Sequence, residues 1–508
     1  MPVINRRELL AGSLALPFLS LSASGQSRPP SSKPSFESRL RPTVHTGVER
    51  WSLAERMSFH AVPGVAVAIL RNGDVEVLEG YGSRLAGSTM PVGPDTLFSV
   101  GSVSKVATAA LCLKLVADGI LDLEADVGRW LRRWRIPPGP DGDETGISLR
   151  MLLSHTAGFN VHGFKDFDPS AQLPSLVQIL TGEPPALNKP LARIDRAGTR
   201  SRYSGGGYMV VQAVIEDATG QPFDTVAQRH LFEPLGMTRS RFDATPARDT
   251  ADIAHAHDES GRPTALPRGW QSFPELAPSG LWASARDLGR LVGALGESYR
   301  GRDGFLPREL AFDMMTEVSP GTFGLGLRLA GEGASRIFHH AGANDSYKAY
   351  IEGNLLTGDG LVILTNGERG GVLGDEIRNA VSDVLGWPGD WSVRISSTAA
   401  SELFDGFTGR YARRASQSPV LAGILDTRIE AEELVVSRTA EGLALEADGR
   451  LQSLKPVSSH RFVFPDAYVP AGTLQIVFDR GSDRQVAQAR LIADDGVLVF
   501  DRAGAGST

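Results

Sequence analysis

Cysteine is almost absent from this chain, because its 508 residues contain only Cys112. A single thiol cannot form a disulfide within the chain, so packing alone must stabilise the fold. No histidine or asparagine context surrounds Cys112, and we expect a small core residue rather than a reactive thiol. A hydrophobic content of 41% and a charged content of 22% are those of a globular protein with an ample core. The length predicts two domains.

The chain also lacks the signatures of several large protein classes. Its net charge is −7 and no basic stripe is present, which argues against a nucleic-acid partner. It carries no Walker motif, no dinucleotide fingerprint and no G-x-S-x-G elbow of an α/β-hydrolase. His255 and His257 come nearest to a metal pattern, but no third ligand stands at a diagnostic spacing. We therefore expect no metal and no cofactor.

Long apolar runs are limited to Leu9–Leu21, which is too short to span a bilayer and contains Pro17. Arg6 and Arg7 precede this run, and Ser22–Gly25 supplies small residues for cleavage. These features predict a twin-arginine export signal over residues 1–26, a leader over residues 27–46 and a periplasmic location. The alternatives are an ordinary secretory signal or an uncleaved anchor.

The most informative stretch is the S-V-S-K segment Ser102–Lys105, at the expected start of a helix. Positions three apart share a helix face, so the serine Oγ and the lysine Nζ can meet. Serine is a weak nucleophile at neutral pH and needs a neighbouring base. An amine can act as that base where burial and the positive end of a helix favour its uncharged form. An isolated S-x-x-K is also common on helices with a solvated lysine, so the pattern needs partners.

Two later segments supply candidate partners. Tyr203 precedes a glycine run that lets backbone come close, and a phenol can relay protons. The segment Phe338–Asn344 enters an expected strand, where a backbone N–H can bind an oxyanion. Taken singly, the first is equally well explained as a turn with a packed tyrosine, and the second as a strand end with satisfied histidines.

In the order S-x-x-K, Tyr, His-x-Gly, these motifs resemble the serine β-lactamase and penicillin-recognising hydrolase family, in its class C-like, esterase and D-aminopeptidase branch. Three more segments are similar to signatures of that branch: Leu149–Phe159, Leu231–Met237 and Ser279–Leu288. The resemblance extends from Trp51 to Leu385.

The resemblance assigns roles to individual residues. It implies that Ser102 is the acylated nucleophile, that Lys105 is its activating base or electrostatic partner, and that Tyr203 moves protons. Backbone N–H groups of Ser102 and Ala343 would form the oxyanion hole. Gly342 completes the His-x-Gly motif at the substrate-binding edge.

This chain departs from the family pattern at two positions. Gly205 stands where the branch often has an asparagine that holds the acyl-side amide and the lysine. His340 stands where the K-T-G motif has a lysine, so a permanent cation for a substrate carboxylate is missing. Both departures argue against an efficient β-lactamase, and Asn344 is a candidate substitute polar contact.

The rest of the sequence predicts an α+β fold. An antiparallel sheet flanked by helices, with an all-helical subdomain, is expected over residues 47–388, and its first hairpin turns at Asn72 and Gly73. The long segment Asn160–Arg202 is predicted either to shape the acyl pocket or to be a surface loop. A linker is predicted over residues 389–403. Seven short apolar runs between Glu433 and Arg502 predict a lipocalin-like β-barrel over residues 404–508, as a stabiliser or cap before a ligand binder.

We therefore expect an exported serine hydrolase that acts through an acyl-enzyme on a small ester, amide or D-peptide. Esterase activity comes first, then D-aminopeptidase, then β-lactamase activity. The rivals are a penicillin-binding sensor that is acylated but slow to turn over, and a functional barrel carried by an inert hydrolase fold. The oligomeric state is not predicted.

Overall fold

The computed structural model of the protein describes residues 35–302, 304–389, 391–396, 401–417, 429, 431–440, 442–447, 449–465, 473–493 and 496–503. The predicted export signal lies outside the described residues, as do parts of the predicted leader and of the predicted linker. Within the described part, no helix combines the length and the apolar character needed to cross a membrane.

An antiparallel six-stranded sheet is the centre of the first part of the chain, with the strand order β3-β2-β10-β9-β8-β7. Its strands are β2 (Gly64–Arg71), β3 (Asp74–Gly82), β7 (Arg328–Ala330), β8 (Ile337–Ala343), β9 (Lys348–Asn354) and β10 (Gly360–Thr365). The predicted hairpin joins β2 to β3. Asn72 and Gly73 both have positive φ values, of 51° and 94°, as a two-residue turn that follows the strand twist requires.

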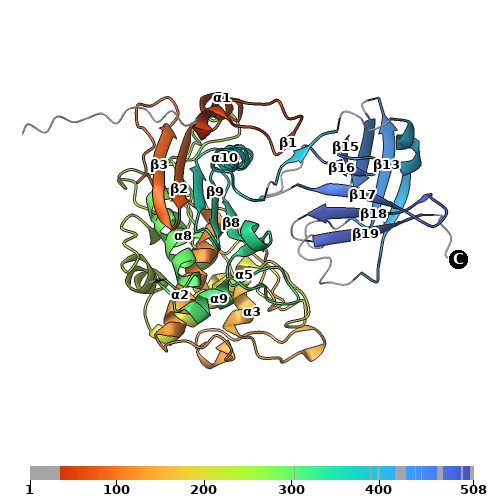
Figure 1. Cartoon of the computed structure of the whole chain (residues 1–508). Coiled ribbons are helices and arrows are strands. Elements are labelled where there is room, and N and C mark those ends of the chain that lie inside the picture. Colours follow the sequence, from red (N-terminus) through yellow and green to blue (C-terminus); the bar gives the residue numbers. More distant parts are fainter. Residues whose placement is uncertain are drawn as a thin grey trace, which may run out of the picture. The chain divides into compact units, whose positions relative to one another are not determined.

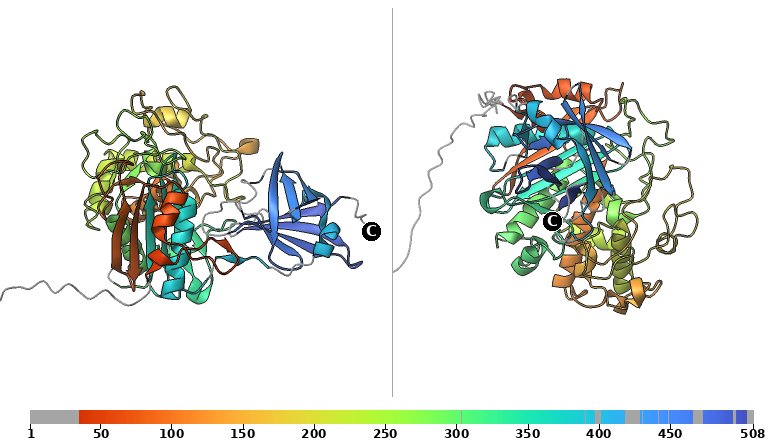
Figure 2. Two further views of the ribbon diagram at one scale, coloured as in Figure 1. Left: turned by 90° about the horizontal axis from the view of Figure 1, so that it is seen from above. Right: turned by 90° about the vertical axis from the view of Figure 1, so that its right-hand side faces the viewer.

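Helices cover both faces of this sheet (Figures 1 and 2). One face packs against α8 (Ala285–Tyr299), and the other against α10 (Gly370–Leu385) and α1 (Leu53–Phe59). Strand β2 is buried on both faces. Its residues Ala66, Ala68 and Leu70 belong to the core on the α8 side, and Val65, Val67 and Ile69 belong to the core on the α10 side. A strand buried on both faces reads as a continuous apolar run.

A helical region packs around α2 (Ser104–Ala117), whose residues are buried on nearly every side. The other helices are α3 (Leu149–Leu153), α4 (Leu176–Thr181), α5 (Gly205–Thr219), α6 (Phe223–Ala227), α7 (Leu276–Ser279) and α9 (Arg308–Met314), and β4 (Phe98–Ser99), β5 (Arg241–Phe242) and β6 (Leu281–Ala283) form a small sheet. This region confirms the predicted helical subdomain. Cys112 is fully buried within α2, and burial raises the pKa of its thiol, so the residue belongs to the core as predicted.

The long segment Asn160–Arg202 is fixed at several points. The backbone N–H of Asp345 donates to Asp166 Oδ2 at 2.9 Å, and Phe167 pairs with Ser272 through two backbone hydrogen bonds. Burial raises the pKa of Asp166 to about 7 and that of Glu275 to about 8, and the Asp166 carboxylate further disfavours charge on Glu275. These two carboxyl groups are therefore held in low-dielectric surroundings beneath the segment.

The C-terminal part is a closed barrel of eight antiparallel strands. The strands are β12 (Gly409–Arg413), β13 (Glu433–Thr439), β14 (Gly442–Ala447), β15 (Arg450–Pro456), β16 (Arg461–Val463), β17 (Gln475–Arg480), β18 (Val486–Ala493) and β19 (Gly496–Arg502). An eight-stranded barrel has room inside for side chains. Phe407, Tyr411 and Phe478 pack in its core, with the Phe407 and Phe478 rings stacked at 4.7 Å. These aromatic side chains fill part of the barrel interior among the residues that the structure describes.

One barrel strand, β12, was not among the seven predicted runs. Its sequence is G-R-Y-A-R, and Tyr411 is its one fully buried residue, so no apolar alternation marks it. It nevertheless closes the barrel by pairing with both β13 and β19. A further short strand, β11 (Val393–Arg394), lies in the predicted linker and pairs in parallel with β1 (Val44–His45).

The two buried carboxyl groups predict a pH dependence of stability. The pKa values of Asp166 and Glu275 in the folded chain lie above their ordinary values of 3.8 and 4.5, so both groups bind protons more tightly when the chain is folded. The folded state therefore holds more protons than the unfolded state between about pH 4 and 8, so their contribution to the free energy of unfolding falls as pH rises through that window. Asp166→Asn and Glu275→Gln should each flatten the slope, measured by urea unfolding at pH 5 and pH 8. The exposed control Glu144→Gln should keep the wild-type slope, and a wild-type slope in both buried variants would contradict the prediction.

Candidate active site

Ser102 and Lys105 meet as the sequence predicts. Ser102 lies in a 3-10 turn, Gly101–Val103, that runs directly into α2, and Lys105 lies in the first turn of that helix. Lys105 Nζ donates a hydrogen bond of 2.9 Å to Ser102 Oγ and another of 2.9 Å to the carbonyl oxygen of Pro278. Lys105 is only 2% exposed, so these two oxygens replace the water that a solvated amine would bind.

The short helix α7 holds the second of these oxygens in place. Thr108 Oγ1 donates to the Ala277 carbonyl at 2.8 Å, and the Leu281 N–H donates to Ser104 Oγ at 3.0 Å. Both bonds join α2 to the segment around α7 on either side of Pro278. The position of the lysine amine is therefore set by two elements far apart in the sequence.

The strand β8 comes unusually close to the turn that carries the nucleophile. A Cβ on Gly342 would lie 2.0 Å from the Val100 carbonyl oxygen, and a Cβ on Gly101 would lie 2.7 Å from the Ala343 nitrogen. Gly101 also has a φ of +49°, which side chains disfavour. Only glycine allows this approach, which brings the backbone of Ala343 beside the residue that precedes Ser102.

Tyr203 precedes α5 and is 8% exposed. Its ring lies 4.4 Å from the His155 ring between centroids, and Lys105 Nζ lies 4.9 Å from the Tyr203 ring centroid. His155 Nδ1 accepts a hydrogen bond of 3.1 Å from the Ser204 N–H, so it fixes the backbone next to Tyr203. Burial, followed by the charge of Lys105, holds the pKa of His155 well below its ordinary value, so the ring is neutral.

A pocket of about 470 Å³ collects all seven residues predicted for the site. They are Ser102, Lys105, Tyr203, His340, Gly342, Ala343 and Asn344. Seven separate stretches of the chain contribute to its lining, including part of the segment Asn160–Arg202. His162, Gly163 and Phe164 are the contributions from that segment, which confirms the prediction that it shapes the pocket.

His340 is neutral at its place in this pocket. Its Nδ1 donates to the Ala341 carbonyl at 2.6 Å, and among the described residues no hydrogen-bond partner meets its Nε2. Burial, the charge of Lys105 and the charge of Arg328 lower the pKa of His340 to about 3. His340 therefore offers a lone pair and not a charge, in agreement with the expectation that it is no permanent cation.

Asn344 lines the pocket and hydrogen-bonds to a neighbouring strand. Its Nδ2 donates to Ser99 Oγ, which ties the end of β8 to β4. One of its amide N–H groups is therefore engaged within the protein, while the residue remains part of the pocket lining.

The sequence reasoning missed two cations that line the pocket. Arg328 lies on β7 opposite His339, and Lys348 lies on β9 opposite Ala343. Lys348 Nζ donates to the Asn344 and Asp345 carbonyls at 2.7 and 3.0 Å, and burial lowers its pKa. With Lys105 these residues give the lining three basic side chains, and no aspartate or glutamate lines the pocket. His340 itself supplies no permanent cation, as expected, but strand pairing brings two basic side chains to the lining from outside the motif.

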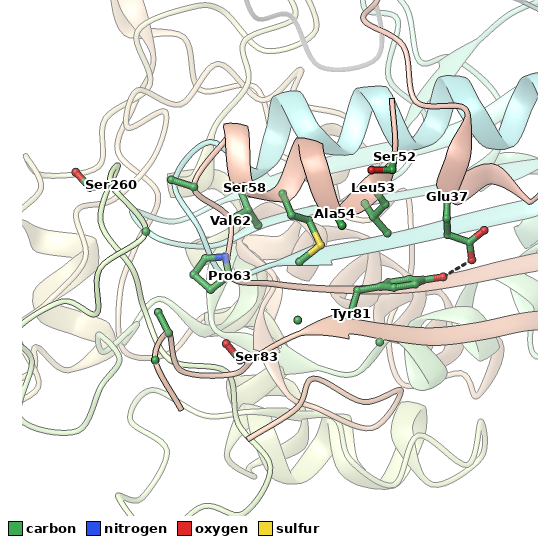
Figure 3. Close-up of a pocket in the computed structure, with 17 residues that line it drawn as sticks. Glu37, Ser52, Leu53, Ala54, Ser58, Val62, Pro63, Tyr81, Ser83 and Ser260 are labelled. Atoms are coloured by element: carbon green, nitrogen blue, oxygen red, sulfur yellow. Dashed lines mark hydrogen bonds between the residues drawn. The ribbon is translucent and has the colours of Figure 1, made fainter. Parts of the chain in front are cut away.

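A larger pocket, of about 920 Å³, shares no lining residue with this one. It lies between α1 and the β2–β3 hairpin (Figure 3), where Tyr81 donates a hydrogen bond of 2.7 Å to Glu37. Its lining contains serines such as Ser52 and Ser58 but no lysine or histidine. Ser52 Oγ donates to the Glu55 carboxylate in an N-terminal helix cap, whereas the serine of the smaller pocket is paired with a lysine amine, the arrangement suited to nucleophilic chemistry.

Of the two histidines considered for metal binding, His257 uses both ring nitrogens in hydrogen bonds to the backbone. His257 Nε2 accepts from the Ala86 N–H at 3.0 Å, and its Nδ1 donates to the Asn366 carbonyl at 2.9 Å. Across the residues that the structure describes, no group of three or more His, Cys, Asp or Glu side chains is arranged to hold a metal ion.

Comparisons with known proteins identify the family of this chain. The model of the Beta-lactamase family matches residues 52–385. The chain is 31% identical over 278 residues to Esterase EstB of Burkholderia gladioli, covering 49% of this chain and 68% of that protein. It is 26% identical over 294 residues to a D-aminopeptidase of Gluconobacter oxydans (strain 621H), covering 57% of this chain and 53% of that protein.

A solved structure gives the same fold. The octameric penicillin-binding protein homologue from Pyrococcus abyssi aligns with a TM-score of 0.55 at 21% identity, over 88% of this chain and 98% of that one. The fold, the family model and the relatives agree with the motifs that the pocket brings together. The chain belongs to the Beta-lactamase family and is a serine hydrolase of the esterase, D-aminopeptidase and β-lactamase type.

Proposed function

We propose that this chain is an exported enzyme that cleaves ester or amide bonds through an acyl-enzyme on Ser102. The observation that carries the proposal is the 2.9 Å hydrogen bond between Lys105 Nζ and Ser102 Oγ inside a pocket that Tyr203 also lines. Nucleophile and base within hydrogen-bond reach, with the base fixed by a third group, is the arrangement that activates a serine. Here the third group is the Pro278 carbonyl.

Acylation begins when Ser102 Oγ attacks the substrate carbonyl carbon and its proton passes to Lys105 Nζ. The negative charge moves to the carbonyl oxygen, which the backbone N–H groups of Ser102 and Ala343 receive. The bond to the leaving group then breaks, Tyr203 delivers a proton to that group, and Lys105 passes the proton taken from Ser102 to Tyr203. An ester of Ser102 and a free alcohol or amine result.

Deacylation reverses the roles of the same groups. Water attacks the acyl carbon and loses its proton through Tyr203 or Lys105, and Ser102 Oγ leaves and recovers a proton. The neutral His340 fits this cycle, because a fixed charge beside Lys105 would oppose the protonation of its amine.

Within this function an ester or a D-configured amide with an anionic group is the favoured substrate. Three basic side chains, Lys105, Arg328 and Lys348, line the pocket, and no aspartate or glutamate is among the described residues of its lining, so a substrate carboxylate gains favourable electrostatic interaction. The similarity to an esterase and to a D-aminopeptidase supports the same two bond types. The twin arginines before the apolar run support export.

A β-lactamase or a slow-turnover penicillin-binding protein is the second candidate. The cations Arg328 and Lys348 favour it, because β-lactams carry a carboxylate. The glycine at position 205 removes an amide that β-lactamases use on the acyl side and weighs against fast turnover.

Removing the proposed catalytic groups should abolish turnover without unfolding the protein. Ser102→Ala should lower kcat by about a thousandfold or more, and Lys105→Ala and Tyr203→Phe by about a hundredfold or more. The mature protein would be assayed with p-nitrophenyl butyrate and with D-alanine p-nitroanilide, and thermal unfolding would be recorded for each variant. Wild-type turnover by Ser102→Ala would refute the proposal. Acylation without turnover in the wild type would favour the penicillin-binding candidate.

Arg328 should matter for anionic substrates. Arg328→Gln is expected to lower kcat/KM by about tenfold for mono-p-nitrophenyl succinate and by far less for p-nitrophenyl butyrate, because only the first acyl group is charged. The control Arg302→Gln changes an exposed arginine that does not line the pocket. Equal losses for both substrates would show that Arg328 does not select charge.

A further inference from the structure

The first turn of α5 is bonded to the segment that begins at Asn160. The first N–H groups of a helix have no partner within it and need one elsewhere. Here Gly205 N–H donates to the His162 carbonyl and Gly206 N–H to the Val161 carbonyl, both at 3.0 Å. Ser204 Oγ caps the helix by accepting from Gly207 N–H at 3.0 Å. The start of α5 therefore fixes where residues 161 and 162 lie.

The space beside Gly205 is already filled. A Cβ at this position would lie 2.9 Å from Phe164 Cε2 and 3.2 Å from the His162 carbonyl oxygen. A side chain at position 205 would have to displace Phe164, so the glycine and the segment are matched to each other. The space that a side chain at position 205 would fill is therefore occupied by Phe164 and the His162 carbonyl group.

His162 presents its ring to the catalytic pocket. It is an exposed residue that lines the same pocket as Ser102 and Lys105. Its ring centroid lies 4.9 Å from that of Tyr203. An imidazole at this place can donate or accept a hydrogen bond beside the group that transfers protons.

We propose that His162 is a substrate-contacting residue that takes the place of the amide missing at Gly205. Its imidazole binds the amide of an acyl group, next to the scissile carbonyl, and Phe164 forms an apolar wall beside it. The favoured substrates are then N-acylated amino-acid esters or amides and not simple alkyl esters. This inference rests on the proposed acyl-enzyme function of Ser102.

The test compares two esters that share the p-nitrophenol leaving group. One carries N-acetyl-D-alanine as its acyl group, and the other carries butyrate, which has no amide. The wild-type protein should prefer the first. His162→Ala should lower kcat/KM for the N-acetyl ester by about tenfold and for butyrate by less than about twofold, because only the first loses a hydrogen bond. His162→Asn should restore part of the preference, and Lys165→Ala, a change of an exposed neighbour that does not line the pocket, should keep it.

A second set of variants tests directly whether the His162 imidazole replaces an amide at position 205. In the His162→Ala background, Phe164→Ala with Gly205→Asn opens the space and returns an amide from α5, and it should recover part of the preference for the N-acetyl ester. Equal losses of both esters in His162→Ala would overturn the proposal, and so would an unchanged preference. If the wild type hydrolyses neither ester, the acyl-enzyme function itself fails and this inference falls with it.

Discussion

The burial of Lys105 is the constraint on which the site depends. An amine shielded from water needs oxygen partners within the protein, and it has two, Ser102 Oγ and the Pro278 carbonyl. The first partner is local and follows from helix spacing. The second requires α7 to lie against α2, which the bonds made by Thr108 and Ser104 secure. The packing of α7 against α2 therefore both folds the helical region and positions the lysine that activates the serine.

The catalytic edge of the sheet has a similar dependence on close packing. Gly101 and Gly342 let two backbones approach where side chains would collide, and this approach brings Ala343 to the nucleophile. Once β8 is fixed there, its neighbours β7 and β9 carry Arg328 and Lys348 into the pocket by strand register. The positive lining is thus a consequence of sheet order and not of the motif itself.

Sequence reasoning succeeded where the information is local or where a motif is shared. Helix spacing brought Ser102 and Lys105 together, and Asn72 with Gly73 fixed the first hairpin. Arg328 and Lys348 were not predicted to line the site, because only strand pairing across the sheet brings them to the pocket that contains Ser102.

Strand β12 was not predicted for a different reason. It lacks an alternating apolar pattern, and only its pairing with β13 and β19 makes it a strand of the barrel. The filling of the space at Gly205 by Phe164 also had no local signal, because 41 positions of chain separate the two residues in the printed sequence.

The most direct test of the central claim is to label the nucleophile itself. The mature protein would be treated with a fluorophosphonate probe, which modifies activated serines, and the labelled peptide would be identified by mass spectrometry. We expect one label, on Ser102, that is lost in Ser102→Ala and strongly slowed in Lys105→Ala. A label on another serine, or undiminished labelling of Ser102 without Lys105, would contradict activation of this serine by the buried lysine.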